Sequence, residues 1–348
     1  MKYAAIVLIA LLGVGILFWE MAFERVILPS GSVQVPETQV LDVPKGSTFR
    51  SVAKKLADQN IISNPRAFLL YLKLKGESQG LKVGEYEIQS GLHLKDLLGI
   101  LTSGKSKQYA ITFPEGSNIF EMADLLEATG RFRAEEFLRE VRNPEVVQKL
   151  IGQRFPSLEG YLFPETYQYT KFTTLKEMVR SMTDRFLKVY EEVSMGYQGP
   201  LKRHEIVTLA SVIEKETGAP GERPLISSVF HNRLKKGMRL QSDPTIIYGY
   251  WVENGEPLRN IRKSDIQKGT PYNTYRVKAL PVGPVANPGA EALKAAMLPA
   301  QSDYLYFVSR NDGTHVFTHT YSDHQKAVRD FQLNRKAREG KSWRNLNK

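Results

Sequence analysis

Two glutamates close an otherwise apolar helical run and are the first candidates for chemistry in this chain. The run, LASVIEKET at 209–217, places Glu214 and Glu216 two positions apart. On an α-helix this spacing turns the two side chains about 200° away from each other, so they cannot face the same place. We expect one carboxyl group to face solvent and the other a cleft, where burial would raise its pKa and make it a proton donor near neutral pH.

Each glutamate also has an ordinary explanation. A single glutamate on a helix is most often a solvated surface charge, and Glu214 fits that description. Glu216 precedes Thr217 and Gly218, where the helix is expected to end. A carboxylate is unfavourable at the C-terminal end of a helix dipole, so this position favours the protonated form of Glu216.

Polar and rigid segments elsewhere in the chain could line a groove beside this helix. They are QSDPT at 241–245, PYNTY at 271–275 and PVGPVANPG at 281–289. Their residue types stack on sugar rings and hydrogen-bond hydroxyl and acetamido groups. The candidates for glycan positioning are Gln241, Ser242, Asp243, Tyr248, Tyr272, Asn273 and Tyr275, followed by Glu165 and Glu159.

Several of these candidates have structural alternatives. Asp243 stands before Pro244 and could simply organise an Asx turn. Tyr272 and Tyr275 could be ordinary core residues, and a surface role is the simpler interpretation of Glu165. The segment NPG at 287–289 could be only a turn.

The composition limits the classes of function. The chain has 348 residues, too many for one ordinary core, with 42% hydrophobic and 24% charged residues, which is typical of globular domains. It has no cysteine, which excludes disulfides, thiolate catalysis and cysteine-ligated zinc, and its six histidines form no His-Glu-x-x-His pattern. We therefore expect no metal and no cofactor. The net charge of +11 suits nucleic acid, anionic lipid or an anionic polymer.

An uncharged apolar run from Tyr3 to Trp19 limits the cellular compartments in which the protein is expected. It could be a signal peptide, but Phe18, Trp19 and Glu20 make a poor cleavage site. We favour one uncleaved transmembrane helix at 1–24. Lys2 lies on the short side, so the positive-inside rule places residues beyond about 25 outside the cytoplasm, which argues against nucleic acid as a partner.

Two similar strand-turn-helix openings, VPKG at 43–46 and FPEG at 113–116, suggest where the folded parts begin. The first opens a small module with the order strand, helix, helix and strand, which resembles a LysM-like, glycan-binding domain. The expected fold class is α+β. The expected parts are an anchor at 1–24, a linker at 25–40, the LysM-like module at 41–108, a mixed α+β catalytic domain at 109–335 and a basic tail at 336–348.

Six segments taken together resemble the YceG-like, or MltG, family of endolytic murein transglycosylases, and the resemblance extends over nearly the whole chain. They are EGYLFPETY at 159–167, ASVIEKET at 210–217, VFHNRL at 229–234, MRLQSDPTIIYG at 238–249, YNTY at 272–275 and LYFV at 305–308. One local departure is GAPG at 218–221, which is richer in glycine and proline than expected.

The resemblance implies a single-pass enzyme of the bacterial inner membrane whose catalytic domain lies in the periplasm. Such enzymes cut nascent peptidoglycan strands internally at the MurNAc-GlcNAc β-1,4 bond and leave 1,6-anhydro-MurNAc ends. The catalytic glutamate of the family falls on Glu216, which acts first as acid and then as base, so no second carboxylate is obligatory, unlike in most glycoside hydrolases. Penicillin-binding proteins are plausible partners.

Two other functions remain open. A catalytically silent, glycan-binding scaffold could recruit proteins of cell-wall synthesis. A hydrolytic muramidase could use water and a second carboxylate, and it would leave a reducing MurNAc end.

Overall fold

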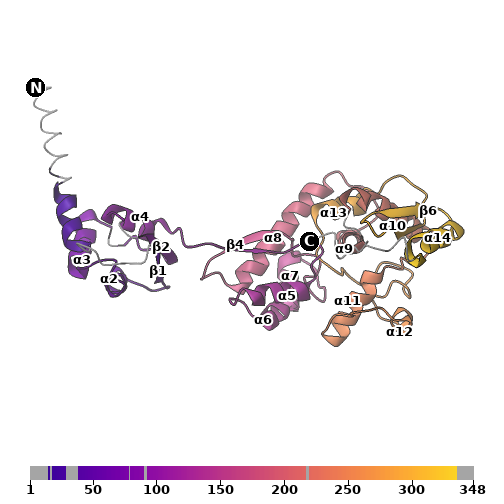
Figure 1. Cartoon of the computed structure of the whole chain (residues 1–348), viewed down its shortest axis with the longest axis horizontal. Coiled ribbons are helices and arrows are strands. Elements are labelled where there is room, and N and C mark those ends of the chain that lie inside the picture. The colour runs from indigo at the N-terminus through magenta and orange to yellow at the C-terminus, as the bar shows by residue number, and fades with distance from the viewer. Residues whose placement is uncertain are drawn as a thin grey trace, which may run out of the picture. The chain divides into compact units, whose positions relative to one another are not determined.

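The structure is a computed structural model that describes residues 15, 18–28, 38–77, 79–89, 92–216 and 219–334. The chain divides into two compact units, Met1–Ala110 with Gln168–Thr173, and Ile111–Tyr167 with Thr174–Lys348 (Figure 1). Most of the expected anchor at 1–24, most of the linker at 25–40 and the whole tail at 336–348 lie outside the described residues. None of the helices in the described part combines the length and the apolar character needed to span a membrane.

The described part of the first unit contains a two-stranded antiparallel sheet, a helical segment at 18–27 and three further helices. The sheet pairs β1 (Thr38–Val43) with β2 (Gly84–Gln89), and the further helices are α2 (Phe49–Asp58), α3 (Pro65–Lys75) and α4 (Leu94–Ser103). The side chain of Thr48 caps α2, and that of Asn64 caps α3, whose first residue is a proline. The predicted order of strand, helix, helix and strand is confirmed. Apolar residues from both strands and all three helices form one core.

The second unit is mainly helical and holds the candidate site. Its elements include α5 (Ile119–Ala128), α6 (Ala134–Val141), α7 (Pro144–Ile151), α8 (Leu175–Ser194), α9 (Arg203–Glu216), α10 (Arg223–Lys235), α11 (Asp243–Asn254), α12 (Lys263–Gln267), α13 (Ala290–Met297), β5 (Tyr306–Ser309), β6 (His315–Thr318) and α14 (Tyr321–Val328). The strands β3 (Tyr109–Thr112) and β4 (Thr166–Tyr169) each divide between the two units. The strand β3 pairs with β4, and β5 pairs with β6. The mixed α+β class is confirmed.

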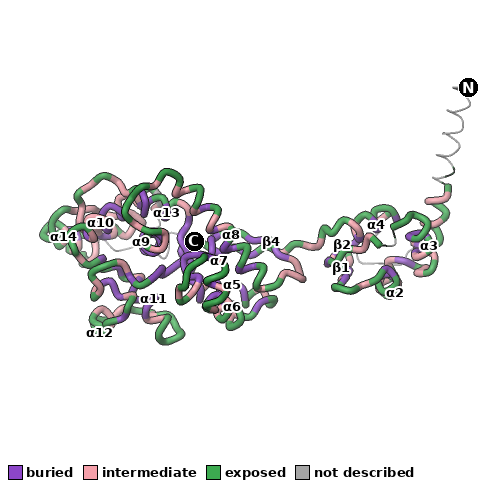
Figure 2. The backbone as a smooth tube through the Cα atoms, turned by 180° about the vertical axis from the view of Figure 1, so that it is seen from behind, coloured by how far each residue is buried: buried purple, intermediate pink, exposed green. Residues whose placement is uncertain are grey.

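Helix α9 is the buried centre of this unit. Every residue from Ile206 to Glu214 is buried, and the helix packs against α10, α11 and α13 (Figure 2). A helix that is apolar all round must lie inside a protein. The two glutamates at its C-terminal end are therefore carried into the interior of the unit.

Candidate active site

The two glutamates at the end of α9 have different surroundings. The side chain of Glu214 is only 4% exposed; its Oε1 accepts a hydrogen bond from Arg223 Nη2 at 2.6 Å and its Oε2 accepts one from the Gly289 amide at 2.9 Å. The expectation that Glu214 is a solvated surface charge is wrong. It fails because α10 and the turn before α13 supply a cation and an amide donor that compensate the buried carboxylate.

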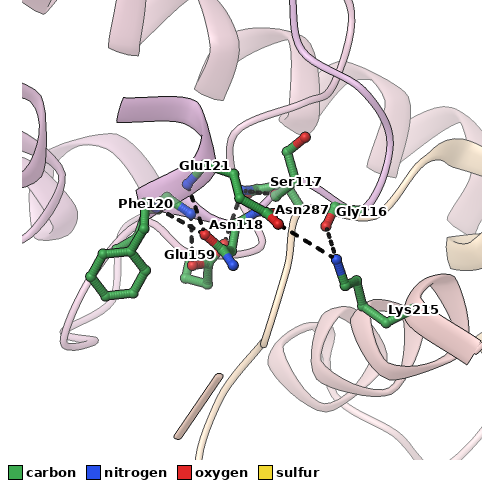
Figure 3. A network of polar contacts seen from close by, with 9 residues as sticks. Gly116, Ser117, Asn118, Phe120, Glu121, Glu159, Lys215 and Asn287 are labelled. Carbon is green, nitrogen blue, oxygen red and sulfur yellow. Dashed lines mark hydrogen bonds and ion pairs between the residues drawn. The ribbon is translucent and has the colours of Figure 1, made fainter. Parts of the chain in front are cut away.

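A second set of contacts holds the same helical turn from another side. Lys215 Nζ donates to the Gly116 carbonyl at 3.1 Å and lies 4.0 Å from the carboxylate of Glu121 (Figure 3). Gly116 has a φ of +78°, which only glycine adopts freely, and a Cβ there would meet the side chains of Glu214 and Lys215 at 3.4 Å. The FPEG turn thus packs directly against the end of α9 and fixes its position.

The buried carboxyl group of Glu159 ties this turn to two other loops (Figure 3). Its Oε2 accepts from the Ile119 amide at 3.0 Å, and its Oε1 accepts from Asn287 Nδ2 at 2.9 Å. Asn287 Oδ1 in turn accepts from the amides of Gly160 and Leu162. Burial raises the pKa of Glu159 to about 8, so the group is protonated at neutral pH. These bonds make Glu159 and Asn287 the joint between three segments.

Glu216, the last residue of α9, is half-buried, and the hydroxyl of Ser242 donates a hydrogen bond to its Oε1. Burial is the main cause that raises the pKa of Glu216, to about 7. The hydrogen bond from Ser242 lowers this pKa, the charge of Asp243 raises it and the charge of Arg233 lowers it. A carboxyl group in this state is both a proton donor and a proton acceptor near neutral pH.

The start of α11 and the YNTY segment lock together beside Glu216. The Ser242 amide donates to Thr274 Oγ1 at 2.9 Å, and the Gln241 amide donates to the Thr274 carbonyl at 3.2 Å. The Tyr275 hydroxyl donates to Asp243 Oδ1 at 2.7 Å. Five predicted site residues, Glu216, Gln241, Ser242, Asp243 and Tyr275, are therefore gathered at the end of α9 by direct contacts or neighbouring positions in the chain.

The remaining candidates have other contacts. Asn273 Nδ2 donates to the carbonyls of Asp265, Ile266 and Lys268, so its amide organises the loop that carries YNTY. Tyr248 is buried; it hydrogen-bonds with Glu159 and packs edge-on against Tyr272, with ring centres 5.0 Å apart. Tyr272 and Tyr275 are both half-exposed, which is unlike ordinary core residues.

Glu165 is exposed and directly precedes β4, at the end of a buried stretch. Its carboxylate forms an ion pair with Arg185 of α8, at 2.6 Å. This contact agrees with the simpler interpretation of Glu165 as a surface residue. Its partner belongs to α8 and not to α9, which carries Glu216.

The sequence profile of the YceG-like family matches residues 41–330. The chain belongs to the YceG-like family. A relative from Bacillus subtilis, named endolytic murein transglycosylase, is 32% identical over 82% of this chain and 83% of its own length. A relative of the same name from Streptococcus pneumoniae is 29% identical over 82% of this chain, and the match spans 57% of that longer protein.

A solved structure of a YceG-like protein from Listeria monocytogenes has the same fold. It superposes with a TM-score of 0.57 at 30% identity and covers 83% of this chain and 98% of its own. The mixed α+β architecture is thus shared with a solved member of the YceG-like family.

Sequence reasoning missed three residues that build this YceG-like site. Arg223 is the partner of Glu214, Thr274 bonds both Gln241 and Ser242, and Arg233 donates to the turn that precedes Ser242. The available signal for Arg233 was a charged residue on the buried face of a helix, within the VFHNRL segment at 229–234. Arg223 and Thr274 act through contacts between separate elements, so the sequence around each of them does not indicate its role.

Proposed function

We propose that this chain is an endolytic murein transglycosylase that cuts the glycan strands of peptidoglycan from within. The observation that carries the proposal is the half-buried carboxyl group of Glu216, with a pKa of about 7, at the end of a rigid buried helix. A single group that must donate a proton and then accept one works best with a pKa near the working pH. The relatives named for this activity support the same assignment.

The proposed reaction needs only this one carboxyl group. Protonated Glu216 donates its proton to the glycosidic oxygen of the MurNAc-GlcNAc β-1,4 bond, and the bond from C1 to that oxygen breaks. The MurNAc C1 develops oxocarbenium character, which its own N-acetyl group stabilises. The Glu216 carboxylate then takes the proton of the C6 hydroxyl while the C6 oxygen bonds to C1. The product is a 1,6-anhydro-MurNAc end, and no water is consumed, in contrast to glycoside hydrolysis.

We assign the first glycan contacts to the exposed and half-exposed groups around Glu216 and on the adjoining YNTY loop. Gln241, Asp243 and Tyr275 lie at Glu216, and Tyr272 opens the loop. Aromatic rings stack on the apolar faces of sugars, and amide and carboxylate groups bond their hydroxyls. The net charge of +11 suits an anionic cell-wall polymer.

For localisation, we propose that the apolar run from Tyr3 to Trp19 anchors the chain once in the bacterial inner membrane. The catalytic unit would then lie in the periplasm, with the first unit acting as a LysM-like glycan-binding module. Alkaline phosphatase, which is active only outside the cytoplasm, should be active when fused after Lys348. An inactive fusion, with a cytoplasmic reporter active at the same position, would contradict this orientation.

The test of the activity is mass spectrometry of the products from uncrosslinked glycan strands. Wild type, Glu216→Gln and the control Glu192→Gln, which changes an exposed glutamate of α8, should be compared. We expect internal fragments lighter by one water than hydrolysis products from the wild type and the control. Glu216→Gln should keep the fold and the binding of glycan and lose these fragments, because the amide cannot donate the proton that the glycosidic oxygen needs.

The other outcomes identify the competing functions. Fragments with hydrated, reducing ends would mean a muramidase and would direct attention to Asp243 as the second carboxylate. Strand binding without fragments from any of the three proteins would mean a scaffold. Full cleavage by Glu216→Gln would refute the role of Glu216.

A further inference from the structure

A buried arginine lies behind the turn that carries Gln241 and Ser242. Arg233, on α10, is 7% exposed. Its Nε donates to the Leu305 carbonyl at 2.7 Å, and its Nη1 donates to the Leu240 carbonyl at 2.8 Å and to Gln241 Oε1 at 3.3 Å. The guanidinium therefore joins α10, the turn before α11 and the start of β5.

The charge of this guanidinium is supported mainly by neutral groups. The oxygens that it binds belong to carbonyls and one amide, and its other contact is the ring of Tyr306, whose centre lies 5.1 Å away. Burial lowers the pKa of Arg233, and the charge of Glu216 acts in the opposite direction. A buried cation whose own contacts are neutral exerts a strong field on the nearest carboxylate.

The backbone that Arg233 holds is strained. Gln241 has a φ of +53°, which non-glycine residues rarely adopt and which persists only when its surroundings impose it. Arg233 binds the carbonyl before this residue and the side chain of the residue itself, while the Thr274 carbonyl binds its amide. The next residue is Ser242, whose hydroxyl donates to Glu216.

We propose that Arg233 is a positioning residue for the reaction of Glu216. It fixes the turn at 239–241 so that the Ser242 hydroxyl meets the carboxyl group, and its charge stabilises the carboxylate that Glu216 becomes after giving up its proton. A guanidinium can do both because its rigid fork of donors binds several carbonyls while it remains charged, whereas a lysine offers a single flexible ammonium. The inference rests on the proposed function of Glu216.

Three groups act on the carboxyl group of Glu216 from the elements around it. Ser242 and Asp243 belong to the start of α11, and Arg233 belongs to α10. Tyr275 of the YNTY loop also faces this set, and burial and the charge of Glu216 raise the pKa of its hydroxyl. Arg233 is the cation of this set, so its removal and its replacement by lysine give distinct effects. Loss of the positive charge should raise the pKa of Glu216, since Arg233 lowers it.

The experiment compares Arg233→Lys with Arg233→Met in the full chain. The pKa of Glu216 is read by ¹³C NMR of labelled glutamate carboxyl groups, with Glu216→Gln to assign the signal. In Arg233→Met the pKa should rise, and the basic limb of kcat/KM on glycan strands should move to higher pH. In Arg233→Lys the charge remains and the pKa should stay nearer that of the wild type. Its kcat should still fall about 10²-fold, with a smaller change in KM, because the turn is no longer fixed.

A second pair of variants covers the case in which both changes at Arg233 unfold the protein. Tyr306→Leu removes the ring against the guanidinium, and Tyr306→Phe keeps it. The leucine variant should shift the Glu216 titration and lower kcat, while the phenylalanine variant should do neither.

The proposal is overturned if the folded variants titrate Glu216 as the wild type does and lose activity only in proportion to unfolded protein. Arg233 would then serve the fold alone. Failure of the proposed function is a separate result. A wild type that releases no anhydro fragments would refute the transglycosylase assignment, while the NMR titration would still measure the coupling between Arg233 and Glu216.

Discussion

Glu214 and Glu216 belong to one helical turn and have different surroundings, and we propose different roles for them. Glu214 forms a buried ion pair with Arg223, which helps to fix the position of α9. Glu216 bonds a neutral hydroxyl, and burial raises its pKa to about 7. Pairs of carboxyl groups with unlike environments are how active sites divide structural and proton-transfer roles.

Ser242 supplies the first prediction at this scale. It is the N-cap residue of α11, yet its hydroxyl makes no capping bond and donates to Glu216 instead. Ser242→Ala should therefore cost little stability. In the wild type the hydrogen bond from Ser242 lowers the pKa of Glu216, so its loss should raise this pKa. The basic limb of the kcat/KM profile should therefore shift to higher pH. The lost stabilisation of the carboxylate should lower kcat about 10- to 100-fold.

The measurement is the pH profile of glycan-strand cleavage by wild type and Ser242→Ala. Ser194→Ala, at the end of α8, is the matched control and should leave the profile unchanged. An unshifted basic limb in Ser242→Ala would show that the hydroxyl does not act on Glu216.

At the scale of elements, α9 positions the site because it is held at its C-terminal turn from two sides. Arg223 and Gly289 bind Glu214, and Gly116 binds Lys215. A catalytic group on a rigid, buried helix is placed more precisely than one on a loop. The end of α9 is thus the fixed point to which the start of α11 brings Ser242.

Arg223 gives a prediction about stability. Arg223→Met leaves the carboxylate of Glu214 buried without its cation, which should lower the free energy of unfolding by about 3–5 kcal/mol. Arg180→Met on the exposed face of α8, where the ion pair with Asp184 is solvated, should cost less than about 1 kcal/mol. Urea unfolding measures both. Adding Glu214→Gln to Arg223→Met should restore part of the lost free energy of unfolding, because the unpaired charge is removed. If the losses of the two single variants simply add in the double variant, the two residues are not coupled.

The sequence predicted some of these elements well and others poorly, for physical reasons. The strand-turn-helix openings at 43–46 and 113–116 have local turn signals, and the structure has a strand before and a helix after each of them. The polar segment QSDPT indicates a turn, but it forms the start of helix α11, because a serine before Asp-Pro also fits an N-cap with proline in the first turn. The gathering of α11, the YNTY loop and α9 depends on contacts between distant segments, which periodicity does not encode.

At the scale of the whole unit, Glu159 and Asn287 join parts of the chain that are far apart in sequence (Figure 3). Asn287 bonds the Ser117 carbonyl, 170 positions away, and the Gly160 amide, 127 positions away. The sequence suggests Glu159 as a secondary candidate for glycan positioning, but the residue is only 3% exposed and its carboxyl group lies inside this joint.

The buried carboxyl group of Glu159 predicts how stability depends on pH. Its folded-state pKa of about 8 lies above the unfolded value of about 4.3, so between these values the folded state binds one proton more. Stability should therefore fall as pH rises through this window, by up to about 1.4 kcal/mol per pH unit. Glu159→Gln has no proton to lose, so this contribution to the slope should vanish, although one lost hydrogen bond should cost about 1 kcal/mol.

Urea unfolding across this pH range checks the prediction, with Glu192→Gln as the exposed control that keeps the wild-type slope. Identical slopes in the wild type and Glu159→Gln would mean that Glu159 does not hold its proton in the folded state.

The joint at Asn287 also has a consequence for the order in which the chain can be built. During synthesis the N-terminal part emerges first, so a contact between distant residues cannot form before the later residue has emerged. Ser117, Gly160 and Leu162 all emerge well before Asn287, the residue that binds them. The centre of this unit therefore stays open until most of the protein has left the ribosome. A chain stalled before that point would expose apolar surface, and such surface is what chaperones bind.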